Sequence, residues 1–193
     1  SRPASGAEHH QSHYWEMQFL LDGIPAVLHG TKVGIGTVLM LELYNALARM
    51  DKPDFAVIRE GISHRPSMEE WEQEMHRCYR DGAEGIIALE KKSRKNDPEG
   101  LMKRLAAIEE NWDEIQALAR TAPKASEIYR VLEEMGAAKV PADVGISREY
   151  VHDGIRYGKE LRDRYTILQL MWDIGELDKA ADWLVEKYCG KIR

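Results

Sequence analysis

Cysteine is almost absent from this sequence. The 193 residues include two cysteines, Cys78 and Cys189, and they stand too far apart to form a CxxC motif. Disulfide-stapled secreted domains and cysteine-rich zinc modules both require several closely spaced cysteines. A chain of this length buries enough surface to fold without such staples. We therefore expect one domain, spanning residues 1–193, in a reducing and cytoplasmic setting.

Long hydrophobic runs and a basic face are lacking as well. The most apolar stretch, residues 33–47, is shorter than the ~20 residues that a membrane span requires, and it contains Glu42. Residues 1–6 lack the apolar run of a signal peptide. The net charge is -6, from 27 basic and 33 acidic residues that are mixed along the chain. A nucleic-acid-binding protein needs a basic face, so we expect neither a membrane nor a nucleic acid as partner.

Strand signals are scarce, and a helical period takes their place. The β-rich run at residues 55–58 is isolated and has no second run to pair with. From Leu101 to Ala119, apolar residues recur at alternating steps of four and three, which places them on one face of a long helix. Asp97 and Pro98 are typical of a helix start, and Pro123 ends the segment. The sequence therefore predicts an all-α helical bundle.

Other helices are predicted from similar signals. Ser67 and Glu70 form a capping box that opens one helix, and Ser147 can cap another. Residues 29–50 are apolar on nearly every side, as in a helix at the centre of a bundle. The remaining predicted helices cover residues 7–21, 124–135, 167–174 and a last segment around Trp183, which we expect in the core. Loops are predicted at residues 51–65, 81–96 and 137–146.

Histidines are concentrated near the beginning of the chain. Four of the seven lie within the first 29 residues: His9, His10, His13 and His29. On a helix, His9 and His13 stand one turn apart on one face with Glu16 nearby, while His10 points elsewhere. Imidazole is the commonest metal ligand in proteins. The same spacing also fits a hydrogen-bonded group of histidines that binds nothing, and the residues alone leave both interpretations open.

Three segments resemble a known family. They are residues 6–17 (GAEHHQSHYWEM), 27–36 (VLHGTKVGIG) and 160–168 (ELRDRYTIL). They are similar to the bacterial glycerol-1-phosphate dehydrogenases, which group with iron-containing alcohol dehydrogenases, glycerol dehydrogenase and dehydroquinate synthase. The resemblance implies the C-terminal helical domain of such an enzyme, which interconverts sn-glycerol 1-phosphate and dihydroxyacetone phosphate with NAD or NADP. The alternatives are a glycerol or other polyol dehydrogenase of the same superfamily and a non-catalytic helical binding module.

The resemblance also assigns roles to individual residues. It implies that His9 and His29 are ligands of a divalent metal (zinc, nickel or iron), together with an aspartate upstream of the present sequence. It implies that His13 faces the substrate as a catalytic or phosphate-contacting residue, with a packing role as the alternative. Separately from the resemblance, Lys32 lies at a helix start, where free amides favour anions, so we expect it to bind the substrate phosphate. A solvated lysine is the alternative there.

No residue of this chain is expected to bind the dinucleotide. Gly34 and Gly36 supply only GxG without a preceding strand, so we expect them to let helices approach closely instead. The dinucleotide-binding domain is expected to be missing together with the aspartate, which predicts that the chain alone is inactive. The expected partners are a phosphorylated polyol and, as the family implies, further copies of the same protein.

Overall fold

The computed structural model describes residues 6–190, and these form α-helices and short 3-10 helices with no strand. The all-α prediction is therefore confirmed for this part of the chain. In order, the α-helices are α1 (Ala7–Leu21), α2 (His29–Leu47), α3 (Phe55–Glu60), α4 (Met68–Tyr79), α5 (Ala83–Ser93), α6 (Pro98–Glu110), α7 (Trp112–Ala119), α8 (Ala125–Glu134), α9 (Arg148–Tyr157), α10 (Ile167–Asp173) and α11 (Leu177–Cys189). The 3-10 helices are η2 (Gly61–His64), η3 (Arg80–Gly82), η4 (Pro141–Val144) and η5 (Gly158–Leu161).

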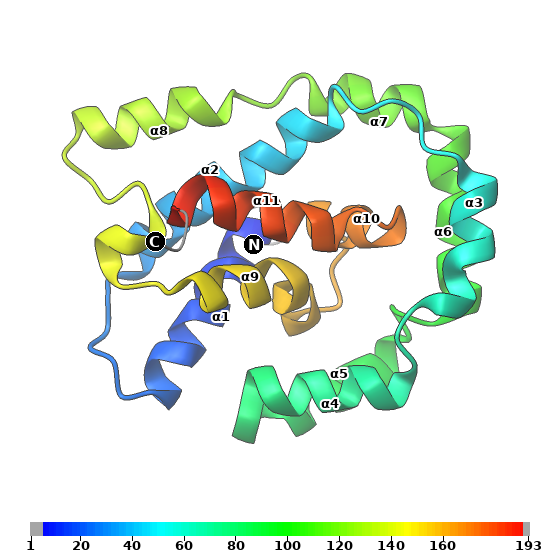
Figure 1. The fold of residues 1–193 in the computed structure, drawn as a ribbon, viewed down its shortest axis with the longest axis horizontal. Helices are drawn as coiled ribbons and strands as arrows, with labels where there is room; N and C mark the ends of the chain where they lie inside the picture. Colours follow the sequence, from blue (N-terminus) through cyan, green and yellow to red (C-terminus); the bar gives the residue numbers. More distant parts are fainter. Residues whose placement is uncertain (1–5, 191–193) are drawn as a thin grey trace.

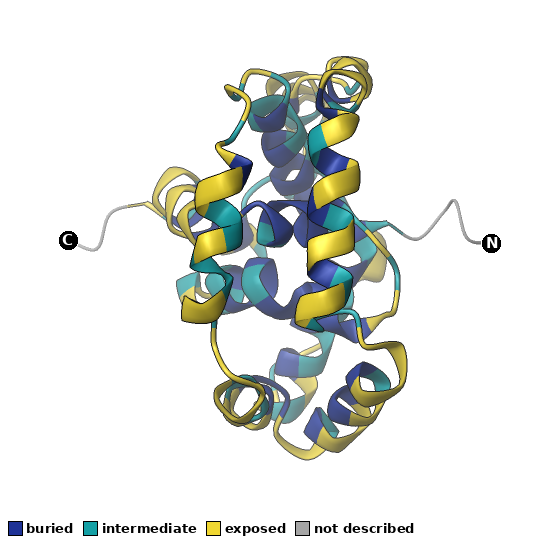
Figure 2. Ribbon diagram, turned by 90° about the vertical axis from the view of Figure 1, so that its right-hand side faces the viewer, coloured by how far each residue is buried: buried dark blue, intermediate teal, exposed yellow. Residues whose placement is uncertain are grey.

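The helices form a central group and a surrounding arc. Figure 1 shows α1, α2, α9, α10 and α11 in the middle, while α3 to α8 run around them. Within the arc, α4 packs on α5 and α3 packs on α6, and α8 returns to pack on α2. Figure 2 shows the buried residues on the inner faces and the exposed ones on the outer faces. None of the helices described in residues 6–190 combines the length and the hydropathy needed to cross a bilayer.

Helix α2 is the central helix that its composition predicts. Ile35, Val38 and Leu39 are fully buried, as expected of a helix that is apolar on nearly every side. At Gly36, a β-carbon would lie 3.0 Å from the backbone oxygen of Glu8 on α1. The missing side chain therefore allows α1 and α2 to pack closely, which confirms the helix-contact role predicted for this glycine.

Two predicted loops contain helices. Residues 51–65 include α3, whose first amides donate to the Asp54 side chain, followed by η2. Residues 81–96 include α5, whose buried positions recur at helical spacing: Ala83, Ile86, Ile87 and Glu90. The loop prediction was wrong because a stripe this short stabilises a helix only when tertiary packing buries it. Here α4 provides that packing surface.

The long helix predicted up to Ala119 is interrupted. Asn111 leaves helical geometry (φ -105°, ψ 20°), so α6 ends before it and α7 begins after it. The apolar face nevertheless continues across the break, because Ile108 and Trp112 are both buried. The expectation that Trp183 belongs to the core was wrong, since 37% of this residue is exposed.

Candidate functional site

The structure brings together three of the four early histidines. His9 and His13 lie on α1, and His29 opens α2. The ring centroid of His29 lies 5.3 Å from that of His9 and 5.1 Å from that of His13, while His9 and His13 are 6.4 Å apart. The side chains of His13 and His29 are 40% and 43% exposed, so a small molecule can reach the cluster from solvent.

In each of these three histidines, one ring nitrogen lies within hydrogen-bonding distance of a carboxylate oxygen. The Nδ1 of His9 lies 2.9 Å from Oε1 of Glu8, that of His13 lies 2.9 Å from Oε2 of Glu16, and that of His29 lies 2.7 Å from Oε1 of Glu16. An ionised carboxylate only accepts hydrogen bonds, so each neutral ring donates from Nδ1 and keeps its lone pair on Nε2. Histidines that bind metals are oriented by carboxylates in this way.

The donor set therefore fits a divalent metal. Neutral imidazole nitrogens are ligands for zinc, nickel and iron. One ligand atom from each of His13, Glu16 and His29 can be chosen so that all three lie within 4.8 Å of one another. Glu16 can accordingly serve in two ways, as a carboxylate ligand or as the acceptor that orients two histidines.

Both carboxylates of the cluster are held in the ionised form. Burial alone would raise the pKa of Glu16, but hydrogen bonds from His29 and His13 and the charge of Lys32 lower it overall. Burial also opposes the ionised form of Glu8, and the hydrogen bond with His9 together with two backbone amides outweighs it and lowers the pKa. The cluster thus keeps negative charge beside its histidines, which favours a bound cation.

Lys32 is part of the same arrangement. Only 2% of this residue is exposed, so the alternative considered for it, a solvated lysine, is wrong. Its Nζ donates to the backbone oxygen of Val27 at 2.6 Å and lies 3.4 Å from Oε1 of Glu16. Lys32 is thus buried in the first turn of α2, with its positive charge directly behind the Glu16 carboxylate that contacts His13 and His29.

His10 points away from the cluster, as the helical spacing predicts. It is 1% exposed, and neither ring nitrogen has a hydrogen-bond partner among the described residues. Burial is the main cause that lowers its pKa to about 4, and the charges of Lys95, Arg162 and Arg164 add to the effect. His10 is therefore neutral and belongs to the interior of the bundle.

Glu8 is the member of the cluster that the sequence reasoning missed. The signal was its position immediately before His9, which lets the two side chains meet near the N-terminus of α1. Glu16 was recognisable from its spacing of three residues after His13, a distance at which helical side chains meet. The link from Glu16 to His29 is a contact between two helices, which local spacing cannot reveal.

The fold and the cluster define a helical domain with a histidine–carboxylate site suited to a divalent metal. The chain is 31% identical over 168 residues to the glycerol-1-phosphate dehydrogenase [NAD(P)+] of Halalkalibacterium halodurans, a match that covers 87% of this chain and 32% of that protein. It is 31% identical over 172 residues to the enzyme of the same name from Geobacillus stearothermophilus, covering 89% of this chain and 33% of that protein. A shorter segment of 51 residues is 51% identical to the Bacillus subtilis protein of that name.

The chain is thus homologous to part of the glycerol-1-phosphate dehydrogenases, and the resemblance of its motifs is confirmed. It spans about a third of the length of these curated relatives. No family model matches the chain, and no solved structure does.

Proposed function

We propose that the chain is the helical metal- and substrate-binding domain of an NAD(P)-dependent dehydrogenase that interconverts sn-glycerol 1-phosphate and dihydroxyacetone phosphate. The names of the relatives support this activity. The observation that carries the proposal is the cluster of three histidines, each of which donates from Nδ1 to a carboxylate. Within the described residues, such a set leaves the Nε2 atoms available as metal ligands at a partly exposed surface, as a catalytic metal site requires.

In this proposal, His9 and His29 hold the metal, which is zinc, nickel or iron. A carboxylate completes the set, either Glu16 or an aspartate from sequence that precedes residue 1. A divalent metal bound there would supply a Lewis acid for the C2 oxygen of the substrate. His13 has its Nδ1 proton fixed by Glu16, so its Nε2 can accept or return the proton of the substrate hydroxyl.

The nicotinamide cofactor is assigned to another domain of the same protein. Residues 6–190 contain no strand that could precede a glycine-rich phosphate loop, and dinucleotide sites of this kind are built on a strand, a loop and a helix. The remaining parts of the proposal are a phosphorylated polyol as substrate, a homo-oligomer as the assembly and a cytoplasmic location. The reducing setting expected from the two cysteines supports that location.

One observation favours the runner-up, a dehydrogenase of glycerol or another unphosphorylated polyol. Lys32 is the residue we expect to contact the phosphate, and its Nζ is already engaged by the Val27 carbonyl and Glu16. For Lys32 to bind the phosphate, its ammonium would have to turn out of this buried position. In the first turn of α2, the amides of Thr31 and Lys32 already donate to the Leu28 carbonyl, so the amides of His29 and Gly30 are the second phosphate-binding element of the proposal.

The test compares two substrates with the complete protein that carries this chain. We expect the protein to reduce dihydroxyacetone phosphate. Its kcat/KM for dihydroxyacetone should be at least ~100-fold lower, which corresponds to about 2.8 kcal/mol of interaction with the phosphate group. Equal kcat/KM values for the two compounds would show that the protein is a polyol dehydrogenase. If neither compound is reduced but the chain still binds zinc, the non-catalytic binding module is the correct function.

A further inference from the structure

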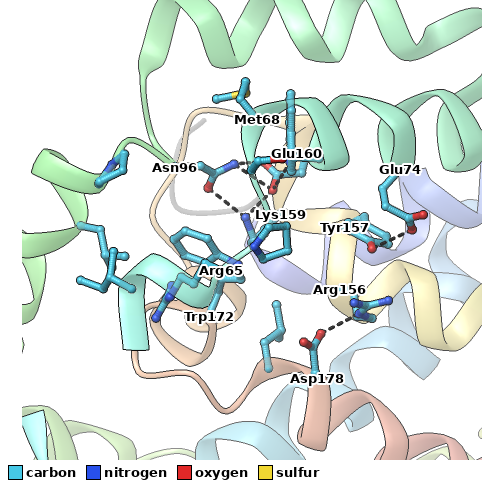
Figure 3. A pocket seen from close by; sticks show the side chains of 17 residues that line it. Arg65, Met68, Glu74, Asn96, Arg156, Tyr157, Lys159, Glu160, Trp172 and Asp178 are labelled. Carbon is cyan, nitrogen blue, oxygen red and sulfur yellow. Dashed lines mark hydrogen bonds and ion pairs between the residues drawn. The ribbon is translucent and has the colours of Figure 1, made fainter. Parts of the chain in front are cut away.

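A cavity of about 350 Å³ lies between the η2–α4 connection, the start of α6, the end of α9 and the α10–α11 connection. Figure 3 shows the side chains that surround it. None of its described lining residues comes from α1 or α2, so the cavity is separate from the histidine cluster. The volume is within the range of small-molecule pockets and about ten times the volume of one water molecule.

The walls of this cavity are largely aromatic and apolar. Trp71, Tyr157 and Trp172 line it together with Met68 and Leu101. Protein interiors pack closely and leave few voids larger than a water molecule. A hollow of this size with aromatic walls therefore suits the flat apolar body of a ligand.

The acidic groups in the lining already have partners. Glu160 pairs with the buried Lys159, and Asp178 accepts from Arg156 at 2.6 Å. Glu74 accepts from Arg77 at 2.8 Å and from the Tyr157 hydroxyl at 2.8 Å. Since each carboxylate is balanced, the lining has no negative charge left to attract a cation.

Arg65 is a positive charge in the lining that forms no direct ion pair with a carboxylate of the described residues, although the charges of Asp173 and Asp178 act on it from a distance. Its Nη2 donates to the backbone oxygen of Asp173 at 2.7 Å, while the carboxylate of Asp173 is held by Arg104. The guanidinium lies 4.4 Å from the centroid of the Trp172 ring, and its Nη1 has no hydrogen-bond partner among residues 6–190. Arg65 also lines a neighbouring hollow of about 380 Å³.

We propose that this cavity binds a small molecule with an aromatic body and a single anionic group, placed on Arg65. A guanidinium that has no ion-pair partner among the described residues favours an anion, because a hydrogen bond between charged groups is stronger than one to a neutral acceptor. A polyol phosphate is a poor fit, because its hydroxyl groups would face tryptophan walls and lose their hydrogen bonds to water. The site is thus distinct from the one proposed for catalysis, and it gives the domain a second ligand.

The test uses indole-3-acetate as the probe and tryptamine as its matched cation with the same ring. We expect saturable binding of indole-3-acetate by calorimetry at a stoichiometry of one, and no binding of tryptamine. Arg65→Gln should weaken the affinity at least ~10-fold, whereas Arg130→Gln, which removes an exposed arginine on α8, should leave it unchanged. Arg65→Lys keeps the positive charge but lacks the planar guanidinium, so its affinity for indole-3-acetate should lie between those of the unaltered chain and Arg65→Gln.

His29→Ala separates this proposal from the proposed function. We expect the variant to lose metal binding and to bind indole-3-acetate as the unaltered chain does. Equal binding of tryptamine, no saturation by indole-3-acetate at millimolar concentration, or an affinity that Arg65→Gln does not change would each overturn the proposal. The comparison of the two probes on the unaltered chain decides the matter even if the Arg65 variants fold poorly.

Discussion

Two clusters of polar side chains in this molecule differ in how completely their hydrogen-bonding groups are used. In the histidine cluster, each ring uses Nδ1, and its Nε2 has no hydrogen-bond partner among residues 6–190. The side chains of His13 and His29 are about two-fifths exposed. Around Glu160, the groups are buried and saturated, because its carboxylate meets Lys159, Lys95 and the side-chain amide of Asn96. The first arrangement is suited to binding and the second to holding helices together.

The pKa of Glu160 shows how strongly its buried surroundings hold the charge. Burial opposes the charge on Glu160, but Lys159 and Lys95 outweigh it and hold the pKa at about 2. This carboxylate stabilises the fold above the pKa of an unfolded glutamate, about 4.3, and the contribution is lost as the pH falls toward 2.

The largest expected effect is on stability, from Glu160→Gln. The substitution leaves the buried ammonium groups of Lys159 and Lys95 without their carboxylate, and breaking such a pair costs about 3–5 kcal/mol. Glu99→Gln is the matched control, because Glu99 forms an exposed pair with Lys103, and solvent-screened surface pairs contribute little to stability. Urea unfolding of both variants measures the difference. Similar midpoints would contradict the assignment of Glu160 as a stabilising group.

The next effect is on metal binding and tests the open cluster. His9→Ala and His29→Ala should each weaken zinc binding at least ~100-fold, about 2.8 kcal/mol, because each removes a ligand. His76→Ala, at an exposed position outside the cluster, should leave the affinity unchanged. His13→Ala is expected to spare the metal and to lower turnover in the complete protein. Calorimetric titration with zinc at neutral pH measures all four. If His13→Ala abolishes binding and His9→Ala does not, the ligands are His13 and His29.

A smaller loss of zinc affinity is expected from Glu16→Gln. If Glu16 orients His13 and His29 without binding the metal, its removal should weaken zinc binding about 10–100-fold. If it is itself a ligand, the loss should equal that of His29→Ala in the same titration. The size of the loss therefore decides between the two arrangements that the geometry allows.

The smallest effect at neutral pH is expected at His10. His10→Leu should keep zinc binding intact and preserve or slightly raise stability, because it replaces an imidazole whose nitrogens lack partners. The pKa of His10 is about 4, against about 6.5 in an unfolded chain. As the pH falls from 6.5 to 4, His10 becomes protonated in the unfolded state but stays neutral in the folded state. The free energy of unfolding therefore falls by up to roughly 3 kcal/mol. Unfolding curves across this range should show a weaker pH dependence in His10→Leu.

Local patterns in the sequence predicted several helix ends correctly. Ser67 and Glu70 form the predicted capping box, with reciprocal hydrogen bonds at 3.2 Å and 2.7 Å. Pro98 opens α6, and Ser147 caps α9 by accepting from the amide of Tyr150. These signals work because a cap depends on residues three or four positions apart. The helix α5 was missed because its stability comes from packing on α4.

The sequence by itself determined that the chain is helical, that His9 and His13 share one face of α1, and that His10 lies on another face. Those features follow from the period of the helix, which is a local property of the backbone. Only the tertiary structure decided that His29 packs against His9 and shares Glu16 with His13, that Lys32 is buried behind this cluster, and that Arg65 borders a cavity. Each of these depends on how distant segments pack, as where Gly36 lets α2 approach α1, and no local pattern specifies that distance.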